Sequence, residues 1–564
     1  MRSVTVITAT VGSPLLREAI ASVKAQTYPQ IAHWIIVDGE EYKDRVAQYT
    51  DDSHTILVLP HNTGSPDRGN YVCHRINAAI PWLVDSDCVC FLDEDNVYEP
   101  THVADLVDAI EGKRWAHSLR SVMAPDGCLL GYDTCECLGG IRHSVLAPDD
   151  FHVDTNCYLL ETDLARQLSP CWNVPARPPA GCLEADRAVC RTLIASKLLP
   201  GVSRKPTVRY RVSGRPDSVS ASFFERGNAV SRFDPQKQDV YLLHFTKEAT
   251  RAFLSSDTHH PLSEWALTLW SGLHAHYNLL DGFANEPVIP SGATVLATLW
   301  HPDALPLQLL KRTDIHRIVF MLESPNIRHA KQFSIAWLEE HADVVLAYWH
   351  PLLDALGPTK SMFCPMNTHA MDLSNPIHRV IGLRPNVGKN RSVAIVLEHR
   401  PRLGGSYTIN GITLQCLDPL RLVYASGLRD ITCYGKGWDA VMPPSKIGHT
   451  LGKMDDPKHS VDILQHHVFA LIIENCDAAG YVSEKVYDCL MAGCVPLYFG
   501  DVPGGLGVDI RQFENGFQLQ TYLDTLSDDD VQQMRDAVCA KRENILRSVG
   551  IPTYTALVQN LLQK

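Results

Sequence analysis

Short apolar, β-branched runs alternate with helix-forming stretches, and this alternation most restricts how the chain can fold. In the first hundred residues the runs Val4–Ile7, Trp34–Val37, Ile56–Leu59 and Cys88–Leu92 are strand-like, and Leu15–Gln26 has helical apolar spacing. Strands that alternate with helices of this length predict an α/β fold with a largely parallel sheet. Ligands of such sheets bind at the carboxyl ends of the strands, so we expect the chemistry there.

The alternation stops in one window and then begins again, which predicts several domains. Residues 255–292 contain the turn-forming strings SSDTHHP and NEPVIPSG around one aromatic stretch. We expect an N-terminal domain over 1–255, a linker or helical connection over 256–284, and two Rossmann-like halves over 285–385 and 386–564. The strand-like runs after the window are Thr294–Leu299, Ile318–Leu322, Val344–Tyr348, Val393–Leu397, Ile431–Tyr434, Ala470–Ile473 and Val495–Phe499.

Composition argues against several classes of protein. Apolar residues make up 45% and charged residues 20% of the chain, which is typical of a globular protein. The net charge of −13 disfavours sequence-independent binding to nucleic acid or to an anionic membrane. The 17 cysteines form no paired Cys-x-x-Cys clusters, and such a scattered set is typical of a reducing compartment. No apolar window reaches the roughly 18 to 20 residues of a membrane span, so we expect a cytoplasmic protein.

Asp93 and Asp95 form an Asp-x-Asp motif directly after a strand-like run. Hard cations such as Mn²⁺ or Mg²⁺ prefer oxygen ligands, and one or two carboxylates with substrate phosphates complete their shell. Such a cation neutralises the charge on a departing nucleoside diphosphate. The motif alone is equally compatible with an Asp-rich turn that precedes a helix.

Further motifs accompany the acidic pair in a fixed order. The strings Thr5–Thr10 (TVITAT), Ser22–Pro29 (SVKAQTYP) and Trp34–Gly39 (WIIVDG) resemble those of family-2 glycosyltransferases of the GT-A fold. The resemblance covers about residues 1–250 and implies a Rossmann-like mixed sheet that holds a nucleotide sugar, with Asp38 on the nucleobase. The donor-binding residues that it implies in this part are Thr8, Asp38, Asp93 and Asp95.

The same resemblance implies a general base near Glu184-Ala-Asp-Arg187. The strings Asp133–Gly139 and His152–Cys157, which precede it, are similar to blocks in one subgroup of these transferases. A base must reach the acceptor hydroxyl and stay ionised near neutral pH. Asp186 is the first candidate because pairing with Arg187 would lower its pKa, and Glu184 is the second. Acidic residues also suit the N-terminus of a helix, and this alternative stays open.

His244 lies in an apolar stretch late in the first domain. A late histidine completes the metal shell in some GT-A enzymes, although a histidine in such a stretch can equally be a packed core residue. The resemblance therefore implies Mn²⁺ or Mg²⁺ as cofactor of the N-terminal domain, with Asp93, Asp95 and His244 as candidate ligands.

The most distinctive string of the second half spans residues 471–500. A strand and a glycine-containing loop lead into a helix that Ser483-Glu-Lys opens, where free amides and Lys485 suit a phosphate group. A plain capped helix is the alternative. The string resembles the signature of family-10 α-fucosyltransferases, with Ser483 in place of Thr, and implies the GT-B fold. The donor-binding residues that it implies are Arg421, Asn475, Tyr481, Glu484 and Lys485.

Two further blocks of the second half fit the same resemblance. Phe320–Pro325 resembles the family's E-S-P block and implies Glu323 as the base, although Glu323 could equally pair with the next helix. Arg421 opens a string similar to the family's R-x-x-x-Y/F-x-x-L helix, and a surface arginine is the alternative. This half lacks a convincing Asp-x-Asp, so we expect basic residues and helix amides to stabilise the leaving group without a cofactor.

The two resemblances together imply one function for the chain. A family-2 domain followed by a fucosyltransferase-like pair is similar in architecture to cytoplasmic bifunctional β1,3-galactosyl/α1,2-fucosyltransferases. We expect a bifunctional inverting glycosyltransferase that uses a UDP-hexose, galactose in the first instance, and GDP-fucose on a glycan or glycoprotein acceptor. Nucleic acid is not an expected partner. The alternative is a single-activity family-2 glycosyltransferase with a C-terminal glycan- or nucleotide-binding module.

Overall fold

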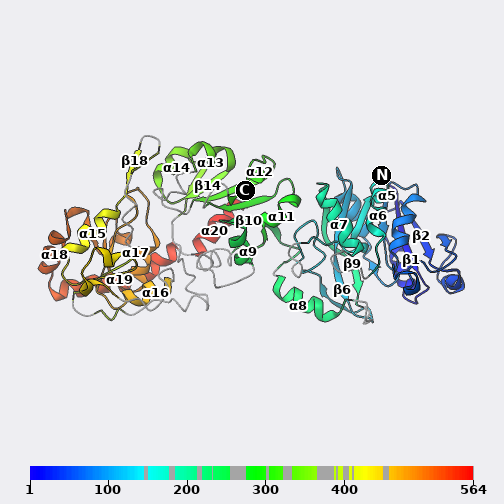
Figure 1. Ribbon diagram of the computed structural model, residues 1–564, viewed down its shortest axis with the longest axis horizontal. Coiled ribbons are helices and arrows are strands. Elements are labelled where there is room, and N and C mark those ends of the chain that lie inside the picture. Colours follow the sequence, from blue (N-terminus) through cyan, green and yellow to red (C-terminus); the bar gives the residue numbers. More distant parts are fainter. Residues whose placement is uncertain are drawn as a thin grey trace. The chain divides into compact units, whose positions relative to one another are not determined.

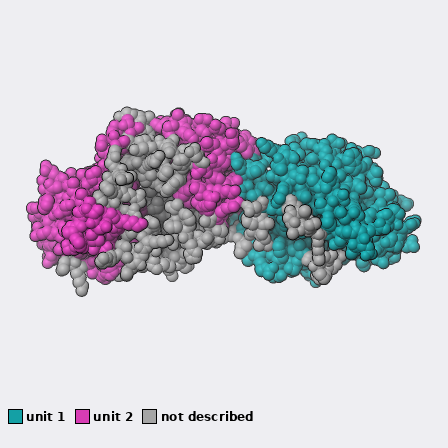
Figure 2. All heavy atoms as spheres, in the orientation of Figure 1, with its two compact units in different colours: residues 1–238, 284–290 teal, residues 239–283, 291–564 magenta. Residues whose placement is uncertain are grey.

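The structure is a computed structural model that divides the chain into two compact units. It describes all residues except 145–149, 177–183, 213–218, 232, 255–272, 274, 300–303, 322–332, 365–385, 389–390, 398–405, 410–411, 449–456, 550 and 563–564. Unit 1 contains residues 1–238 and 284–290, and unit 2 contains residues 239–283 and 291–564 (Figure 2).

Unit 1 is built on a nine-stranded mixed sheet. Its strands are β1 (Val4–Thr10), β2 (Ile31–Val37), β3 (Thr55–Val58), β4 (Cys88–Phe91), β5 (Val97–Tyr98), β6 (Trp115–Met123), β7 (Leu129–Tyr132), β8 (Tyr158–Glu161) and β9 (Gly201–Arg211). They lie in the order β3-β2-β1-β4-β8-β6-β9-β5, with β7 paired to β6. Figure 1 labels β1, β2, β6 and β9 of this sheet. The pairs from β3 to β4 are parallel, whereas β8 is antiparallel to β4 and to β6. The expected α/β fold with a Rossmann-like mixed sheet is thereby confirmed for this unit.

Several helices of unit 1 contribute buried apolar residues to the core around this sheet. The helices of this unit are α1 (Leu16–Lys24), α2 (Lys43–Val46), α3 (His74–Ala79), α4 (His102–Ala109), α5 (Thr162–Gln167), α6 (Ser169–Trp172), α7 (Ala185–Ala195) and α8 (Ala221–Ser231). In α7 the buried residues are Ala185, Val189, Cys190 and Leu193, at the spacing of one helix face. This packing fixes the first turn of α7, which carries Asp186.

Unit 2 contains two further sheets and a hairpin. The six-stranded sheet has the order β11-β10-β12-β13-β14-β15, and the five-stranded sheet has the order β19-β16-β20-β21-β22. The strands are β10 (Gln238–His244), β11 (Tyr277–Asp281), β12 (Thr294–Thr298), β13 (His316–Met321), β14 (Val344–Ala347), β15 (Ser361–Phe363), β16 (Val393–Val396), β17 (Ser406–Ile409), β18 (Ile412–Gln415), β19 (Ile431–Tyr434), β20 (Phe469–Ile472), β21 (Val495–Tyr498) and β22 (Val508–Asp509). In the six-stranded sheet β10, β12, β13, β14 and β15 are joined by parallel pairs, as are all neighbours in the five-stranded sheet. The expected GT-B pairing of the two sheets stays a prediction.

The helices of unit 2 include a C-terminal one that returns to the first of these sheets. Val558 and Leu561 of the last helix share a core with residues of β10, β12 and β13. Among the described residues, we find no helix with the length and apolar character that a membrane crossing requires. The helices are α9 (Lys247–Leu254), α11 (Gly282–Asn285), α12 (Leu307–Leu310), α13 (Ile335–His341), α14 (His350–Leu356), α15 (Asp418–Gly427), α16 (Pro457–Leu464), α17 (Glu484–Met491), α18 (Gly516–Thr525), α19 (Asp528–Ser548) and α20 (Ile551–Leu562).

The boundary between the units differs from the boundary expected at residue 255. The apolar run that forms β10 pairs in parallel with β12, because a strand buried on both faces needs neighbours in a sheet. Residues 239–254 therefore belong with the six-stranded sheet of unit 2, and β11 forms within the segment 256–284 that was expected to be a linker. Residues 284–290 return to unit 1, where Val288 joins the core.

Candidate functional site

Two of the predicted donor-binding carboxylates lie at the carboxyl ends of parallel strands. Asp38 follows β2 and Asp93 follows β4, and β1 lies between these two strands. The Asp38 carboxylate is buried and accepts the backbone N–H groups of Thr63 (2.7 Å) and Gly64 (3.3 Å). Asp38 thereby fixes the loop after β3, at the edge where sheets of this kind bind ligands.

Asp93 is held by two asparagines. Its backbone N–H donates to Asn156 Oδ1 (2.7 Å), and its Oδ2 accepts from Asn156 Nδ2 (2.7 Å) and Asn96 Nδ2 (3.3 Å). Burial, with repulsion from Asp95 and Asp154, raises the pKa of Asp93 to about 7. The side chain is thus both oriented and electrostatically crowded.

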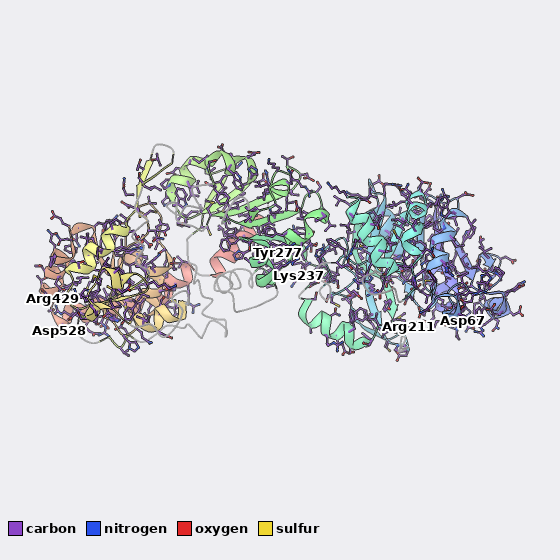
Figure 3. The ribbon with its side chains drawn as sticks, in the orientation of Figure 1. Asp67, Arg211, Lys237, Tyr277, Arg429 and Asp528 are labelled. Carbon is purple, nitrogen blue, oxygen red and sulfur yellow. The ribbon has the colours of Figure 1, made fainter. Side chains whose placement is uncertain are left out.

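The loop after β4 carries Asp93, Glu94 and Asp95, and the last two of these form hydrogen bonds with segments that are distant in the sequence. Glu94 Oε2 accepts the hydroxyl of Thr10 (2.5 Å) and the backbone N–H of Ser13 (3.0 Å). The backbone carbonyl of Asp95 accepts from Nε of Arg211 (3.0 Å), the last residue of β9, which is labelled in Figure 3. These contacts leave the loop after β4 with a defined backbone path.

Two predicted residues lie inside cores. Thr8 is fully buried in β1, and its hydroxyl is hydrogen-bonded with His33 Nε2 (3.0 Å). The structure therefore does not expose the Thr8 side chain to a ligand. His244 ends β10 and is buried, with Nδ1 placed 3.2 Å from Thr298 Oγ1. It belongs to unit 2, so the structure does not group it with the two aspartates of unit 1, and its role as a metal ligand stays a prediction.

The base candidate Asp186 lies in the first turn of α7, partly open to solvent. Its Oδ2 is 3.0 Å from His152 Nε2, and its Oδ1 accepts the backbone N–H of Arg187 (2.7 Å). Burial raises the pKa of Asp186, but attraction to His152 and Arg187 outweighs it and lowers the pKa to about 2. Glu184 precedes the helix, is 60% exposed, and lies 3.7 Å from the Arg187 guanidinium. The geometry thus favours Asp186 over Glu184 as the oriented carboxylate.

A buried arginine lies between three carboxylates near these acids. Arg120 on β6 donates to Asp133 (2.9 Å), to Glu136 (2.7 Å) and to Asp154. All four side chains are at most 9% exposed. A buried guanidinium with three ionic partners satisfies groups that would otherwise be costly to bury.

A continuous path of contacts connects the two predicted functional acids. Asn156 donates one amide N–H to Asp93 and the other to Asp154 (2.7 and 2.8 Å). Arg120 then joins Asp154 to Glu136, whose carboxylate lies 3.9 Å from the imidazole that contacts Asp186. The strand-end acid and the base candidate therefore belong to one buried polar network of unit 1.

The residues that organise this network were not predicted from the sequence. His152 and Asn156 lie in the block 152–157, which resembles known transferases and was the available signal. Arg120 lies in β6, whose residues are all buried, and a charged residue within a fully buried strand indicates a specific partner. Arg211 carried no comparable signal in the sequence.

In unit 2 the predicted phosphate-binding lysine lies at the start of α17. Ser483 caps the helix, and its hydroxyl accepts the backbone N–H (3.4 Å) and Nζ (3.0 Å) of Lys485. Nζ also faces Glu484 (3.3 Å) and Glu474 (3.7 Å), and these carboxylates outweigh burial and raise the pKa of Lys485. Tyr481 is buried just before the cap. The structure therefore brings Glu474, Ser483, Glu484 and Lys485 together at one helix N-terminus.

Arg421 is committed to internal contacts. Its guanidinium donates to Asp418, to the backbone carbonyl of Ile473 (3.1 and 3.2 Å) and to Asn475 Oδ1 (2.5 Å), and it is 1% exposed. Arg421 and Asn475, two predicted donor-binding residues, therefore lie together, but their side chains are hydrogen-bonded to each other. Glu323, the predicted base of this half, lies outside the described residues.

The strand-end acids of unit 1 fit a hard cation. Burial and the nearby carboxylate of Asp95 raise the pKa of Asp93, and a bound cation would offset the repulsion between these two carboxylates. Within the described residues, no group of three or more His, Cys, Asp or Glu side chains is arranged to hold a metal ion. A cation at this edge would thus take Asp93 and Asp95 from the protein and its other oxygens from a substrate or from water.

Comparisons with known proteins find similarity in two parts of the chain. Residues 3–128 match the family described as glycosyl transferase family 2. An alpha-(1,4)-fucosyltransferase of Arabidopsis thaliana is 36% identical over 74 residues, which are 12% of this chain and 18% of that protein. The chain thus matches less than a fifth of that relative's length.

Solved structures give weaker similarity. Crystal structures of S. aureus TarS and of its residues 1–349 align with TM-scores of 0.27 and 0.26, at 14% and 12% identity. The first alignment covers 37% of each chain, and the second covers 51% of this chain and 69% of the other. These TM-scores are too low to support an argument about fold or function. What the comparisons establish is that residues 3–128 match the model of glycosyl transferase family 2, which covers less than a quarter of the chain.

Proposed function

We propose that unit 1 is an inverting, metal-dependent glycosyltransferase that transfers a hexose, galactose in the first instance, from a UDP-sugar. The observation that carries this proposal is the network that joins the strand-end acid Asp93 to the surroundings of Asp186. Asp38, Asp93 and Asp95 lie on the edge of the sheet that serves ligands, which supports their assignment to the donor.

The reaction needs one base and one stabilised leaving group. The Asp186 carboxylate accepts the proton of an acceptor hydroxyl while that oxygen bonds to the anomeric carbon of the donor. The bond from this carbon to the diphosphate breaks on the opposite face, and its electron pair leaves with the nucleoside diphosphate. Mn²⁺ or Mg²⁺ held by Asp93 and Asp95 would supply charge neutralisation for that diphosphate. A single carboxylate base without a covalent intermediate gives inversion at the anomeric carbon.

For unit 2 we propose transfer of fucose from GDP-fucose without a metal. Lys485 and the amides at the start of α17 support this assignment, because they offer positive charge and N–H donors to a diphosphate. Glu323 is the proposed base, as the string around it suggests. The contacts of Arg421 argue for a role in shaping the site rather than in direct binding of phosphate.

The two activities would act in succession on one glycan or glycoprotein acceptor. This order resembles that of the bifunctional β1,3-galactosyl/α1,2-fucosyltransferase that modifies Skp1 in the cytoplasm. The second candidate is a single transferase in unit 1 with a glycan- or nucleotide-binding module in unit 2. The ion pairs that Lys485 makes with Glu474 and Glu484 are compatible with this candidate as well.

The experiment uses the full chain and two substitutions, one in each unit. Wild-type protein is incubated with UDP- and GDP-sugars and a panel of glycan acceptors, with and without Mn²⁺. Asp95→Ala should abolish the Mn²⁺-dependent first transfer and leave fucose transfer to a pre-extended acceptor unchanged. Lys485→Ala should give the reverse pattern, because removing the charge at the helix N-terminus weakens diphosphate binding.

Each variant serves as the folding control of the other, since one activity must survive in each. Loss of both activities from a folded Asp95→Ala protein would contradict two independent sites. Nucleotide-sugar binding by unit 2 without any transfer would favour the binding-module candidate.

A further inference from the structure

The imidazole of His152 is the buried partner of the Asp186 carboxylate. His152 Nε2 lies 3.0 Å from Asp186 Oδ2, and the two side chains are 5% and 20% exposed. An acceptor can therefore reach Asp186 from solvent, whereas His152 is covered. An ionised carboxylate only accepts hydrogen bonds, so the contact assigns the Nε2 proton to His152.

His152 faces a carboxylate on each ring nitrogen. Glu136 Oε1 lies 3.9 Å from Nδ1 and also accepts from Arg187 (2.6 Å), which in turn lies 3.6 Å from Asp150. Nδ1 has no hydrogen-bond partner among the described residues. Burial lowers the pKa of His152, but attraction to Asp186 and Glu136 outweighs it, and the net pKa is raised. The surroundings thus favour the imidazolium form.

We propose that His152 is a positioning residue for Asp186, which it orients through Oδ2 and keeps ionised. This inference rests on the proposed role of Asp186 as the base of unit 1. The second Asp186 oxygen accepts the backbone N–H of the next residue, so both oxygens have fixed directions. A carboxylate held in this way presents its remaining lone pairs to the acceptor hydroxyl without a search over rotamers.

The charge of His152 has a consequence for the dependence of the rate on pH. A cation beside Asp186 favours the carboxylate and keeps its pKa low, so protonation of the base should not limit the wild-type rate between pH 5 and 8. Removal of the cation lets the pKa of Asp186 rise. The variant should then lose activity as the pH falls, because a growing fraction of Asp186 is protonated and cannot accept a proton.

The first test replaces His152 by glutamine, which keeps an N–H donor but carries no charge. For His152→Gln we expect kcat to fall at least about tenfold near pH 5.5 and clearly less near pH 8. The KM for the nucleotide sugar should change by less than about twofold, because His152 acts through the base and not on the donor. A purely structural role would instead lower kcat by the same factor at every pH.

The matched control is His102→Gln, which removes another buried imidazole of unit 1. His102 pairs with Thr207 Oγ1 (2.8 Å), and burial lowers its pKa to about 3, so it carries no charge near neutral pH. Its loss should leave the shape of the pH profile unchanged.

The second test needs no activity. The imidazole of His152 is followed by NMR in histidine-labelled full-length protein, and its signal is assigned by its absence from His152→Gln. Its pKa should fall in Asp186→Asn, because the carboxylate that raises it is gone. A His152 titration that Asp186→Asn leaves unchanged overturns the inference, as does a His152→Gln profile that runs parallel to the wild type.

The kinetic test and the NMR test together distinguish a failure of this inference from a failure of the proposed function. Wild-type protein that transfers no sugar from any nucleotide sugar would refute the proposed function and with it the role of His152 toward a base. Active protein combined with an unchanged His152 titration would refute only the pairing of the two residues.

Discussion

At the scale of single residues, the site of unit 1 depends on charges that are buried together. Arg120 compensates three carboxylates, and its guanidinium lies over the ring of Tyr210 at 4.4 Å. Asp133 is held in addition by the backbone N–H groups of residues 135–137 (2.9–3.1 Å). The acids cannot turn toward water when their cation is removed, so the network is stable only as a whole.

We predict that Arg120→Met destabilises unit 1 by about 3–5 kcal/mol, because it leaves buried carboxylates without a partner. The matched control is Arg209→Met on β9, which removes an ion pair with Glu99 whose side chains are 46% and 30% exposed. That change should cost less than about 1 kcal/mol. Urea denaturation followed by a probe in unit 1 measures both values, and equal costs would contradict the importance assigned to the network.

The sequence predicted where the acids lie but not what holds them. Asp93 and Asp95 could be picked out because acidic residues directly after a strand form a local pattern, whereas Asp186 was found through the resemblance to family-2 glycosyltransferases. Their partners are distant in the chain: His152 is 34 residues from Asp186, and Arg211 is 116 residues from Asp95. Such pairs depend on the register of the strands, which a single sequence does not specify. Arg421 was assigned to phosphate through the resemblance to family-10 fucosyltransferases, and the sequence did not reveal its internal contact with Asp418.

At the scale of elements, close contact between two helices of unit 2 depends on two glycines. A Cβ atom on Gly427, the last residue of α15, would lie 2.2 Å from the carbonyl carbon of Gly516. A Cβ atom on Gly516, the first residue of α18, would lie 2.0 Å from the carbonyl oxygen of Tyr424. The obstructing atoms belong to the backbone and cannot move aside without shifting a helix.

We predict that Gly427→Ala destabilises unit 2 by about 1–3 kcal/mol through this overlap. Helix propensity alone would favour alanine by about 1 kcal/mol, so the sign of the effect separates packing from propensity. The control is Ser426→Ala at the neighbouring exposed position of α15, which should be nearly neutral. A thermal melt that shows Gly427→Ala to be stabilising would contradict the close approach.

The sequence predicted many elements correctly, since buried strands are continuous apolar runs. The runs expected at residues 4–7, 88–92 and 495–499 correspond to β1, β4 and β21. The sequence did not predict which sheet β10 joins. An apolar run shows that a strand is buried, but its neighbours are chosen by contacts far along the chain, here with β12.

At the scale of the whole molecule, the chain passes between the units three times, at 238/239, 283/284 and 290/291. Val288, which lies in the sequence between β11 and β12 of unit 2, is 3% exposed in the core of unit 1. The stability of unit 1 therefore depends in part on Val288, which comes after a 45-residue segment of unit 2 (239–283) in the sequence.

We predict that Val288→Ala lowers the stability of unit 1 by about 1–3 kcal/mol, since it leaves a cavity in that core. Hydrogen exchange followed by mass spectrometry should show faster exchange in peptides from β1 and β4, with little change in peptides from β20 and β21. Altered protection confined to peptides of unit 2 would show that residues 284–290 belong there instead.

This triple passage has a consequence for how the two activities could be separated, by cloning or by recombination between genes. A fragment that ends at residue 255 carries a strand of the other unit and lacks Val288, whereas a fragment that begins at 285 lacks β10 and β11. Neither unit is one uninterrupted stretch of the chain. A single cut therefore yields two incomplete units. To exchange one unit for another, residues 239–290 must be transferred together with it, because this segment contributes to both units.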